Sequence, residues 1–143
     1  DVSCIVMGGH GPTMVPITRT ATVGGVPLTD ILSQKEIDAI VKRVQEAGTE
    51  LVKLYGKGSA FFSPAAAITE MIEAYLRDKK RVIPSAAYCE GEYGIDGYFI
   101  GVPAVIGAGG VEKILEVDLT DQEKELLQST LEKVKVTVSE TGL

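Results

Sequence analysis

The sequence predicts one α+β domain in which an antiparallel sheet packs against long helices. Segments 37–55 and 68–76 carry apolar residues at helical spacing, whereas the second half holds three strand-like runs separated by glycine-rich turns. Helices and strands grouped in separate stretches are typical of α+β domains. A chain of 143 residues with 45% hydrophobic and 24% charged residues fits a single globular unit, so residues 1–143 are assigned to one domain.

The first segments are short and rich in glycine. An apolar run at 4–7 leads into Gly8-Gly9-His10-Gly11, where glycines permit a sharp turn at a strand end. Residues 14–23 are predicted as a strand because β-branched side chains dominate and Gly24-Gly25 follows as a turn.

Two helices are expected next. Ser33-Gln34-Lys35-Glu36 is a capping-box pattern that opens the first, and Gly56 with Gly58 ends it. Ser63-Pro64 is interpreted as the N-cap and first turn of the second. One stripe of each helix is expected to be buried, with Met71 and Tyr75 filling core rather than holding a cofactor; the stripes are Ile37, Ile40, Val41, Val44, Leu51, Val52 and Tyr55, then Ile68, Met71, Ile72, Tyr75 and Leu76.

The second half changes to the period of strands. Runs at 81–89, 98–106 and 111–119 are predicted strands, separated by turns at 90–94 and 107–110. A second capping box, Thr120-Asp121-Gln122-Glu123, opens a last helix whose Leu126, Leu127, Leu131 and Val134 are expected to face inward.

Charge and cysteine content exclude several classes. A net charge of −6 argues against nucleic acid or an anionic membrane as partner, because phosphate binding needs clustered Lys and Arg. The uncharged stretch 97–111 is too short, and too interrupted by glycines and a proline, to cross a bilayer. Cys4 and Cys89 form no C-x-x-C motif, so reduced thiols in a cytoplasmic protein and no metal site are expected. The chain lacks the basic leader of a signal peptide, so none is expected; because it opens on Asp1 rather than methionine, we expect a preceding segment to have been removed.

His10 is the only histidine in the chain. Histidine can give and take a proton near neutral pH, so the residue is a candidate acid or base. The alternative is a turn histidine whose ring is satisfied by a neighbouring carbonyl. These four residues taken alone leave both interpretations open.

Other chemistry-bearing groups are weaker candidates. Glu90, Glu92 and Asp96 could bind a cation or supply paired carboxylates, although a solvated turn rim is the preferred interpretation. Cys4 could pair with His10, but a thiol within an apolar strand is usually inert packing. The glycines at 107–110 precede a strand rather than a helix, so the chain carries no dinucleotide fingerprint of its own.

A family resemblance joins these motifs. The chain resembles the lactate/malate dehydrogenase superfamily, most of all its lactate-dehydrogenase-like malate dehydrogenase branch, and it resembles only the C-terminal, catalytic half of such an enzyme. The resemblance keeps the order and spacing of Gly8-Gly9-His10-Gly11, Met14-Val15-Pro16, Gly25-Val26-Pro27-Leu28, Gly58-Ser59-Ala60-Phe61-Phe62-Ser63-Pro64-Ala65-Ala66, Lys80-Arg81-Val82-Ile83-Pro84, Glu90-Gly91-Glu92-Tyr93-Gly94 and Tyr98-Phe99-Ile100-Gly101-Val102-Pro103.

The resemblance implies an NAD-dependent oxidoreductase of the tricarboxylic acid cycle that interconverts malate and oxaloacetate. It makes His10 the proton acceptor and donor, and it places Ala60 and Pro64 against the nicotinamide. It also places the NAD-binding Rossmann domain before Asp1, so NAD would be bound mainly outside this chain and the isolated chain is expected to be inactive. Pro12 stands where the branch usually has an acidic residue; it removes an N–H and stiffens the loop.

The expected partners follow from the same resemblance. They are a small 2-hydroxy or 2-oxo dicarboxylate and further copies of the chain, as a dimer or tetramer. The enzymatic alternative is the C-terminal domain of a lactate dehydrogenase, because the residue that separates malate from lactate lies in a loop outside this sequence. The non-enzymatic alternative is a folded oligomerisation fragment without turnover.

Overall fold

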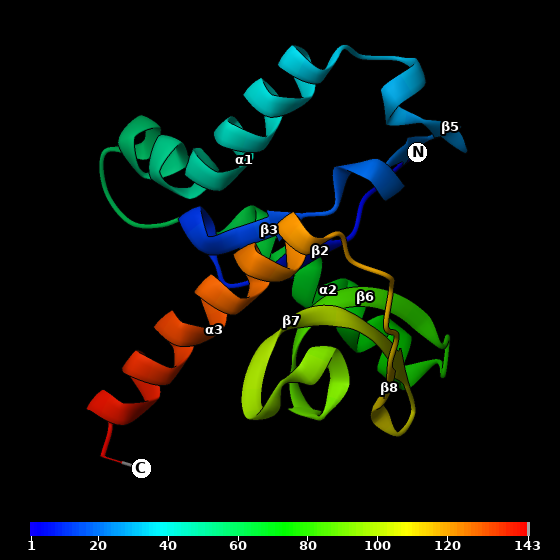
Figure 1. The fold of residues 1–143 in the computed structure, drawn as a ribbon, viewed down its shortest axis with the longest axis vertical. Helices are drawn as coiled ribbons and strands as arrows, with labels where there is room; N and C mark the ends of the chain where they lie inside the picture. The colour runs from blue at the N-terminus through cyan, green and yellow to red at the C-terminus, as the bar shows by residue number, and fades with distance from the viewer. Residues whose placement is uncertain (143) are drawn as a thin grey trace.

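The computed structural model describes residues 1–142 as an α+β arrangement of antiparallel strands and three long helices (Figure 1). The main sheet has the order β3-β2-β7-β6, with β8 also paired to β7, and a small sheet has the order β1-β4-β5. Every strand pair in the described chain is antiparallel, as the sequence predicts. The main-sheet strands are β2 (Val6–Gly8), β3 (Met14–Pro16), β6 (Arg81–Glu90), β7 (Asp96–Gly107) and β8 (Gly110–Ile114). The others are β1 (Val2–Ser3), β4 (Thr22–Val23) and β5 (Val26–Pro27).

The hydrophobic core lies between the main sheet and α3 (Asp121–Glu140). Alternate residues of β7, Ile100 and Val102 among them, face the same side and meet Leu127 and Leu131 of α3. The period-two pattern of the strand and the helical spacing of the leucines therefore produce this core as expected. Leu126 departs from the expectation, because its side chain is 49% exposed.

Helix α1 (Gln34–Tyr55) begins and ends where the sequence predicts. The Glu36 carboxylate accepts hydrogen bonds from the Ser33 N–H at 2.8 Å and from the Ser33 hydroxyl at 2.7 Å. Gly56 ends the helix with φ of 69°, a left-handed conformation that favours glycine. The expected buried stripe is wrong for this chain: Ile37 is the buried member, while Ile40, Val44, Val52 and Tyr55 are exposed. Helix α1 lies at the top of Figure 1, and its side-chain hydrogen bond to the sheet runs from Gln45 to Met14.

Helix α2 (Phe62–Leu76) begins earlier than predicted. Its N-cap is Phe61, so Ser63 and Pro64 already lie inside the first turn. The backbone N–H groups of that turn have no partner within the helix, so a proline there costs no helical hydrogen bond. The helix lies behind β6 and β7 in Figure 1, and Ala74 is its fully buried residue. Met71 and Tyr75, predicted to fill core, are exposed instead, because the sheet covers only the narrow face that carries Ala74.

The predicted strand over 14–23 is interrupted. It is β3 as far as Pro16, after which Ile17 turns with φ of −86° and ψ of 72°, and the 3-10 helix η2 (Thr18–Thr20) follows. The Ile17 side chain is buried and its N–H still donates to the Ile5 carbonyl at 2.8 Å; the next strand, β4, joins the small sheet.

The predicted strand over 111–119 is shorter than expected. Strand β8 ends at Ile114, and the chain then leaves the sheet edge to bind the turn at Tyr93. The Tyr93 hydroxyl donates to the Leu115 carbonyl at 2.6 Å and accepts from the Val117 N–H at 2.9 Å. These bonds replace the ladder that periodicity alone would predict.

Candidate functional site

The single histidine lies on a tight turn between two paired strands. Gly8, the last residue of β2, pairs with Met14, the first residue of β3, and His10 precedes the 3-10 helix η1 (Gly11–Thr13). The Gly9 N–H donates to the Thr13 carbonyl at 3.3 Å, and the Thr13 hydroxyl donates to the His10 carbonyl at 3.4 Å. Thr13 therefore closes the turn on both sides of His10.

Two glycines allow this turn to lie close to its neighbours. A Cβ atom on Gly8, whose φ is +83°, would lie 2.9 Å from the Thr13 oxygen. A Cβ on Gly101 of β7 would lie 2.5 Å from the Gly8 oxygen. Only glycine fits such approaches, so the glycine-rich sequence around His10 reflects packing as well as turning.

Two helices hold the return side of the turn. The Thr130 hydroxyl of α3 donates to the Thr13 carbonyl at 2.7 Å, and the Gln45 side-chain amide of α1 donates to the Met14 carbonyl at 3.1 Å. The two accepting carbonyls are consecutive along the chain. Neither helical residue is predicted from the sequence, although a polar residue at 130 between the inward-facing Leu127 and Leu131 is a signal that identifies Thr130.

The imidazole itself faces outward. His10 is exposed, and its ring makes no hydrogen bond with any residue in 1–142, so the alternative of a ring satisfied by a neighbouring carbonyl is not what the structure holds. A rigid backbone thus presents an accessible ring. That arrangement suits a proton donor or acceptor whose reaction partner comes from outside this domain. Pro12, exposed in the first turn of η1, is accommodated there without loss of a backbone hydrogen bond.

Ala60 and Pro64, predicted to face a nicotinamide, flank the start of α2. Ala60 is half-buried in the connection between α1 and α2, and Pro64 is exposed. No hydrogen bond in the described chain joins this segment to the turn at His10. Phe61 and Phe62 lie between Ala60 and Pro64 in the chain, and their side chains are 65% and 79% exposed. Residues 60–64 therefore form a mostly apolar corner of the surface.

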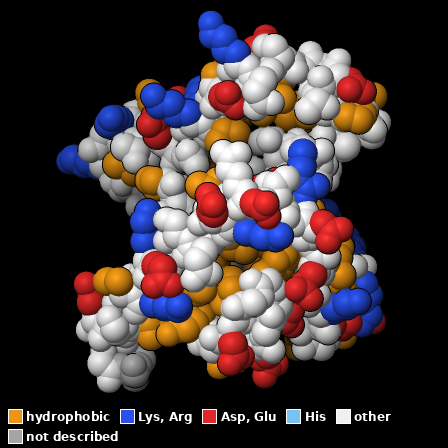
Figure 2. Space-filling view, in the orientation of Figure 1, with side chains coloured by type: hydrophobic (Ala, Val, Ile, Leu, Met, Phe, Trp, Pro, Cys, Tyr) orange, Lys and Arg blue, Asp and Glu red, His pale blue; other side chains and the backbone are white. Residues whose placement is uncertain are grey.

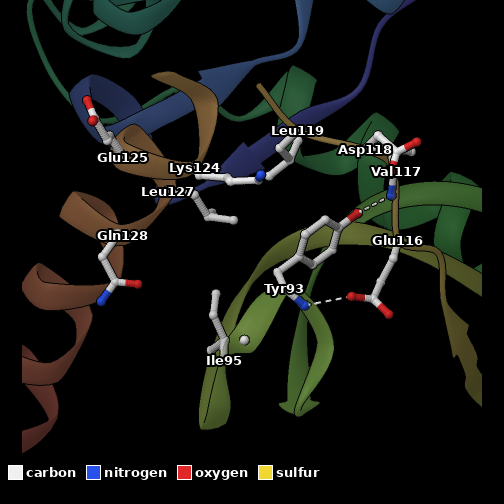
Figure 3. Close-up of a pocket in the computed structure, with 11 residues that line it drawn as sticks. Tyr93, Ile95, Glu116, Val117, Asp118, Leu119, Lys124, Glu125, Leu127 and Gln128 are labelled. Carbon is white, nitrogen blue, oxygen red and sulfur yellow. Dashed lines mark hydrogen bonds between the residues drawn. The ribbon is translucent and has the colours of Figure 1, made fainter. Parts of the chain in front are cut away.

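Two cavities border α3. One of about 580 Å³ is lined by Tyr93, Ile95 and residues 116–119 on one side and by α3 residues such as Leu127 on the other (Figure 3). Figure 2 shows apolar side chains gathered in a hollow in the middle of this face, with charged groups around it. A second cavity, of about 450 Å³, lies between α1, β3 and α3, and Thr13 and Thr130 are among its lining residues. His10 lines neither.

The two cysteines are free thiols and neither meets His10. Cys89 is fully buried, and burial, followed by the nearby Glu92 and Glu116 charges, raises its thiol pKa to about 11. Burial also raises the pKa of Cys4, whose sulfur donates weakly to the Ile5 carbonyl. Both thiols are therefore protonated at neutral pH and behave as packing groups.

The acidic turn has a local structural role. The Glu92 carboxylate accepts a hydrogen bond from the Glu90 N–H at 2.7 Å, and backbone hydrogen bonds of this kind lower the Glu92 pKa. Within residues 1–142, no cluster of three or more His, Cys, Asp or Glu side chains has the geometry to hold a metal ion. No helix among these residues is long and apolar enough to span a membrane.

A dinucleotide has no cradle within the described residues. Binding a dinucleotide at a strand-to-helix turn requires parallel strands with a glycine-rich loop at a helix N-terminus. Here the strand pairs are antiparallel, and the glycines at 107–110 join β7 to β8.

Comparison with known proteins gives consistent matches. Residues 1–141 match the family model of the lactate/malate dehydrogenase alpha/beta C-terminal domain. A malate dehydrogenase of Myxococcus xanthus is 55% identical over all 143 residues, which are 46% of that protein. The solved structure of malate dehydrogenase from Salinibacter ruber superposes with a TM-score of 0.96 at 48% identity, covering 99% of this chain and 46% of that one. Lactate dehydrogenase from Eimeria maxima, solved with NADH and oxamate, superposes with a TM-score of 0.95 at 35% identity, covering 99% and 44%. The chain thus spans about half the length of the relatives it matches.

Proposed function

This chain belongs to the lactate/malate dehydrogenase family as its alpha/beta C-terminal domain, and on that premise we propose that it supplies the proton-transfer group of a malate dehydrogenase. The reaction is the NAD-dependent interconversion of malate and oxaloacetate. His10 is the proton acceptor and donor. The observation that carries the proposal is an exposed imidazole on a turn that is fixed by glycine packing and by two helices.

In this reaction the part of this chain is to transfer one proton. An imidazole nitrogen of His10 accepts the hydroxyl proton of the 2-hydroxy acid during oxidation and returns it during reduction. Bound NAD supplies the hydride acceptor, and that chemistry belongs to the cofactor. Ala60 and Pro64 are the residues of this chain that would hold the nicotinamide. Fixing the His10 backbone matters because the base must stay within hydrogen-bond reach of the substrate hydroxyl.

Substitution of His10 tests the proposal in a full-length protein that carries this chain. His10→Asn should lower kcat by roughly a hundredfold to ten-thousandfold, the usual contribution of general acid–base catalysis. NADH affinity, measured by NADH fluorescence, should stay unchanged. Lys113→Asn, at an exposed position on β8, is the matched control and should leave kcat unchanged. Wild-type turnover by His10→Asn removes the residue from its proposed role.

The isolated chain gives an independent test. Mixed with malate and NAD, the 143-residue chain should produce no NADH absorbance, because it holds no dinucleotide cradle. Turnover by this chain alone contradicts the proposal that NAD is bound mainly outside this chain. In the full-length protein, a comparison of oxaloacetate with pyruvate separates the malate dehydrogenase from the lactate dehydrogenase alternative, which the Eimeria maxima likeness supports.

Exposed apolar side chains support an assembly role beside the catalytic one. They gather on α1, on α2 and in the connection between them: Val52, Leu54, Tyr55, Phe61, Phe62, Ile68, Ile72, Tyr75 and Leu76. Surfaces of this kind mark interfaces. We propose a homo-oligomer, dimer or tetramer, in the cytoplasm, where free cysteines persist. Sedimentation as a monomer contradicts the oligomer; a stable oligomer of the full-length protein that shows no turnover with malate and NAD would favour the oligomerisation fragment without catalysis.

A further inference from the structure

Thr130 makes an unusual hydrogen bond for a threonine inside a helix. Such hydroxyls commonly donate to the carbonyl four residues earlier in the same helix, as Thr69 does to Ala65 and Thr137 does to Lys133. Thr130 instead donates to the Thr13 carbonyl at 2.7 Å, 117 positions away in sequence. The Thr130 hydroxyl therefore binds the turn that carries His10 rather than its own helix.

The side chain is also held firmly on the helix. Thr130 is 4% exposed and lies beside Leu131, which is equally buried in the core cluster. Its methyl and hydroxyl groups lie 3.3 Å from the position a Cβ would take on Gly8. A rigid helix thus contacts the turn with both branches of one side chain, the apolar branch by packing and the polar branch by a hydrogen bond.

The contact reaches His10 through Thr13. The Thr13 carbonyl accepts from Thr130 and from the Gly9 N–H, and the Thr13 hydroxyl donates to the His10 carbonyl. Loss of the Thr130 hydroxyl leaves the Thr13 carbonyl with a single, longer bond of 3.3 Å from Gly9. The oxygen is then still satisfied, so the fold loses little, but the turn loses its attachment to α3.

We propose that Thr130 is a positioning residue for proton transfer: through Thr13 it holds the His10 imidazole at the point where the substrate hydroxyl is presented. This inference rests on the proposed function of His10. Thr130 itself touches no substrate. Its effect is on the geometry of the base, so it should act on kcat and leave binding unchanged.

The test uses the full-length protein with three variants. Thr130→Val keeps the shape and the methyl contact but removes the hydroxyl, and kcat should fall about ten- to a hundredfold, the range expected when a catalytic group is misplaced by about 1 Å. The KM of the acid substrate and the Kd of NADH should stay within about twofold. Thr130→Ser keeps the donor and should restore most of kcat. Thr20→Val removes a comparable hydroxyl-to-carbonyl bond, from Thr20 to Ile17 at 2.8 Å, and should leave kcat unchanged.

The results of these variants support or overturn the positioning role of Thr130. A Thr130→Val enzyme with wild-type kcat overturns the inference, as does a loss of Tm with unchanged kcat per folded molecule, which is what a purely stabilising residue gives. Should Thr130→Val not fold, Thr130→Ala removes the hydroxyl without placing a methyl against the Thr13 oxygen and is judged by the same criteria. If His10→Asn is inactive while Thr130→Val is fully active, only the positioning role fails. If His10→Asn is active, the proposed function fails with it.

Discussion

Replacing Gly101 by alanine inserts a methyl group where β2 and β7 lie closest. Gly8 and Gly101 are the register pair that joins these strands, and a Cβ on Gly101 would lie 2.5 Å from the Gly8 oxygen and 3.3 Å from the Gly8 nitrogen. Gly101 has no left-handed φ, so backbone strain does not enter. The substitution therefore tests packing alone.

The magnitude follows from the geometry. Moving from 2.5 Å to an ordinary contact of 3.4 Å requires the strands to separate by about 0.9 Å. Overpacking of this kind costs about 1–3 kcal/mol of unfolding free energy. Because Gly8 leads directly into the turn of His10, the same displacement should lower kcat of the full-length enzyme by roughly ten- to a hundredfold.

The assay is urea unfolding followed by far-UV circular dichroism, together with NADH-coupled turnover. Gly48→Ala is the control, because Gly48 lies inside α1 with open space around its Cβ position. That variant should be neutral or gain up to about 1 kcal/mol, since alanine favours the helix. A Gly101→Ala protein with wild-type unfolding free energy and wild-type kcat refutes the reasoning.

Two further predictions concern the third helix. Leu131→Ala should lower the unfolding free energy by about 2–5 kcal/mol, because the side chain is 4% exposed in the core, whereas Leu126→Ala, at 49% exposure, should cost under about 1 kcal/mol by the same urea titration. Burial raises the Glu123 pKa, but hydrogen bonds from the Thr120 N–H and from Arg19 outweigh it and lower the pKa below its ordinary value. Its stabilising contribution is thus complete above about pH 4.3 and is lost as the pH falls through the lowered folded-state pKa. Glu123→Gln should be less stable by about 1 kcal/mol at pH 7, and that difference should shrink in acid unfolding curves; a difference independent of pH contradicts the assignment.

Local signals in the sequence are accurate where each element depends on neighbours in the chain. The capping boxes at Ser33 and Thr120 begin α1 and α3, because side chains three residues apart satisfy the first N–H groups of a helix. Alternating and glycine-flanked runs locate β6 and β7 within one or two residues. The motif at residues 8–11 places the only histidine on a turn, and its order with the other motifs predicts the family that the comparisons show.

Burial is less accurate, because periodicity reports that a face is apolar without reporting what covers it. The stripes of α1 and α2 have helical spacing, yet Val52 and Met71 are exposed in this chain. The strand predicted over 111–119 ends at Ile114 because Tyr93 captures the following backbone, a contact that no window of local sequence contains.

The sequence by itself therefore determined the α+β class, the starts of α1 and α3, the two long strands and the presence of His10 on a glycine-rich bend. These features arise from propensities and bonds within a few residues. Only the tertiary structure decided that the turn is held by Gly101 on one strand and by Thr130 and Gln45 on two helices. Those partners lie tens of residues from His10, and folding is what brings them together.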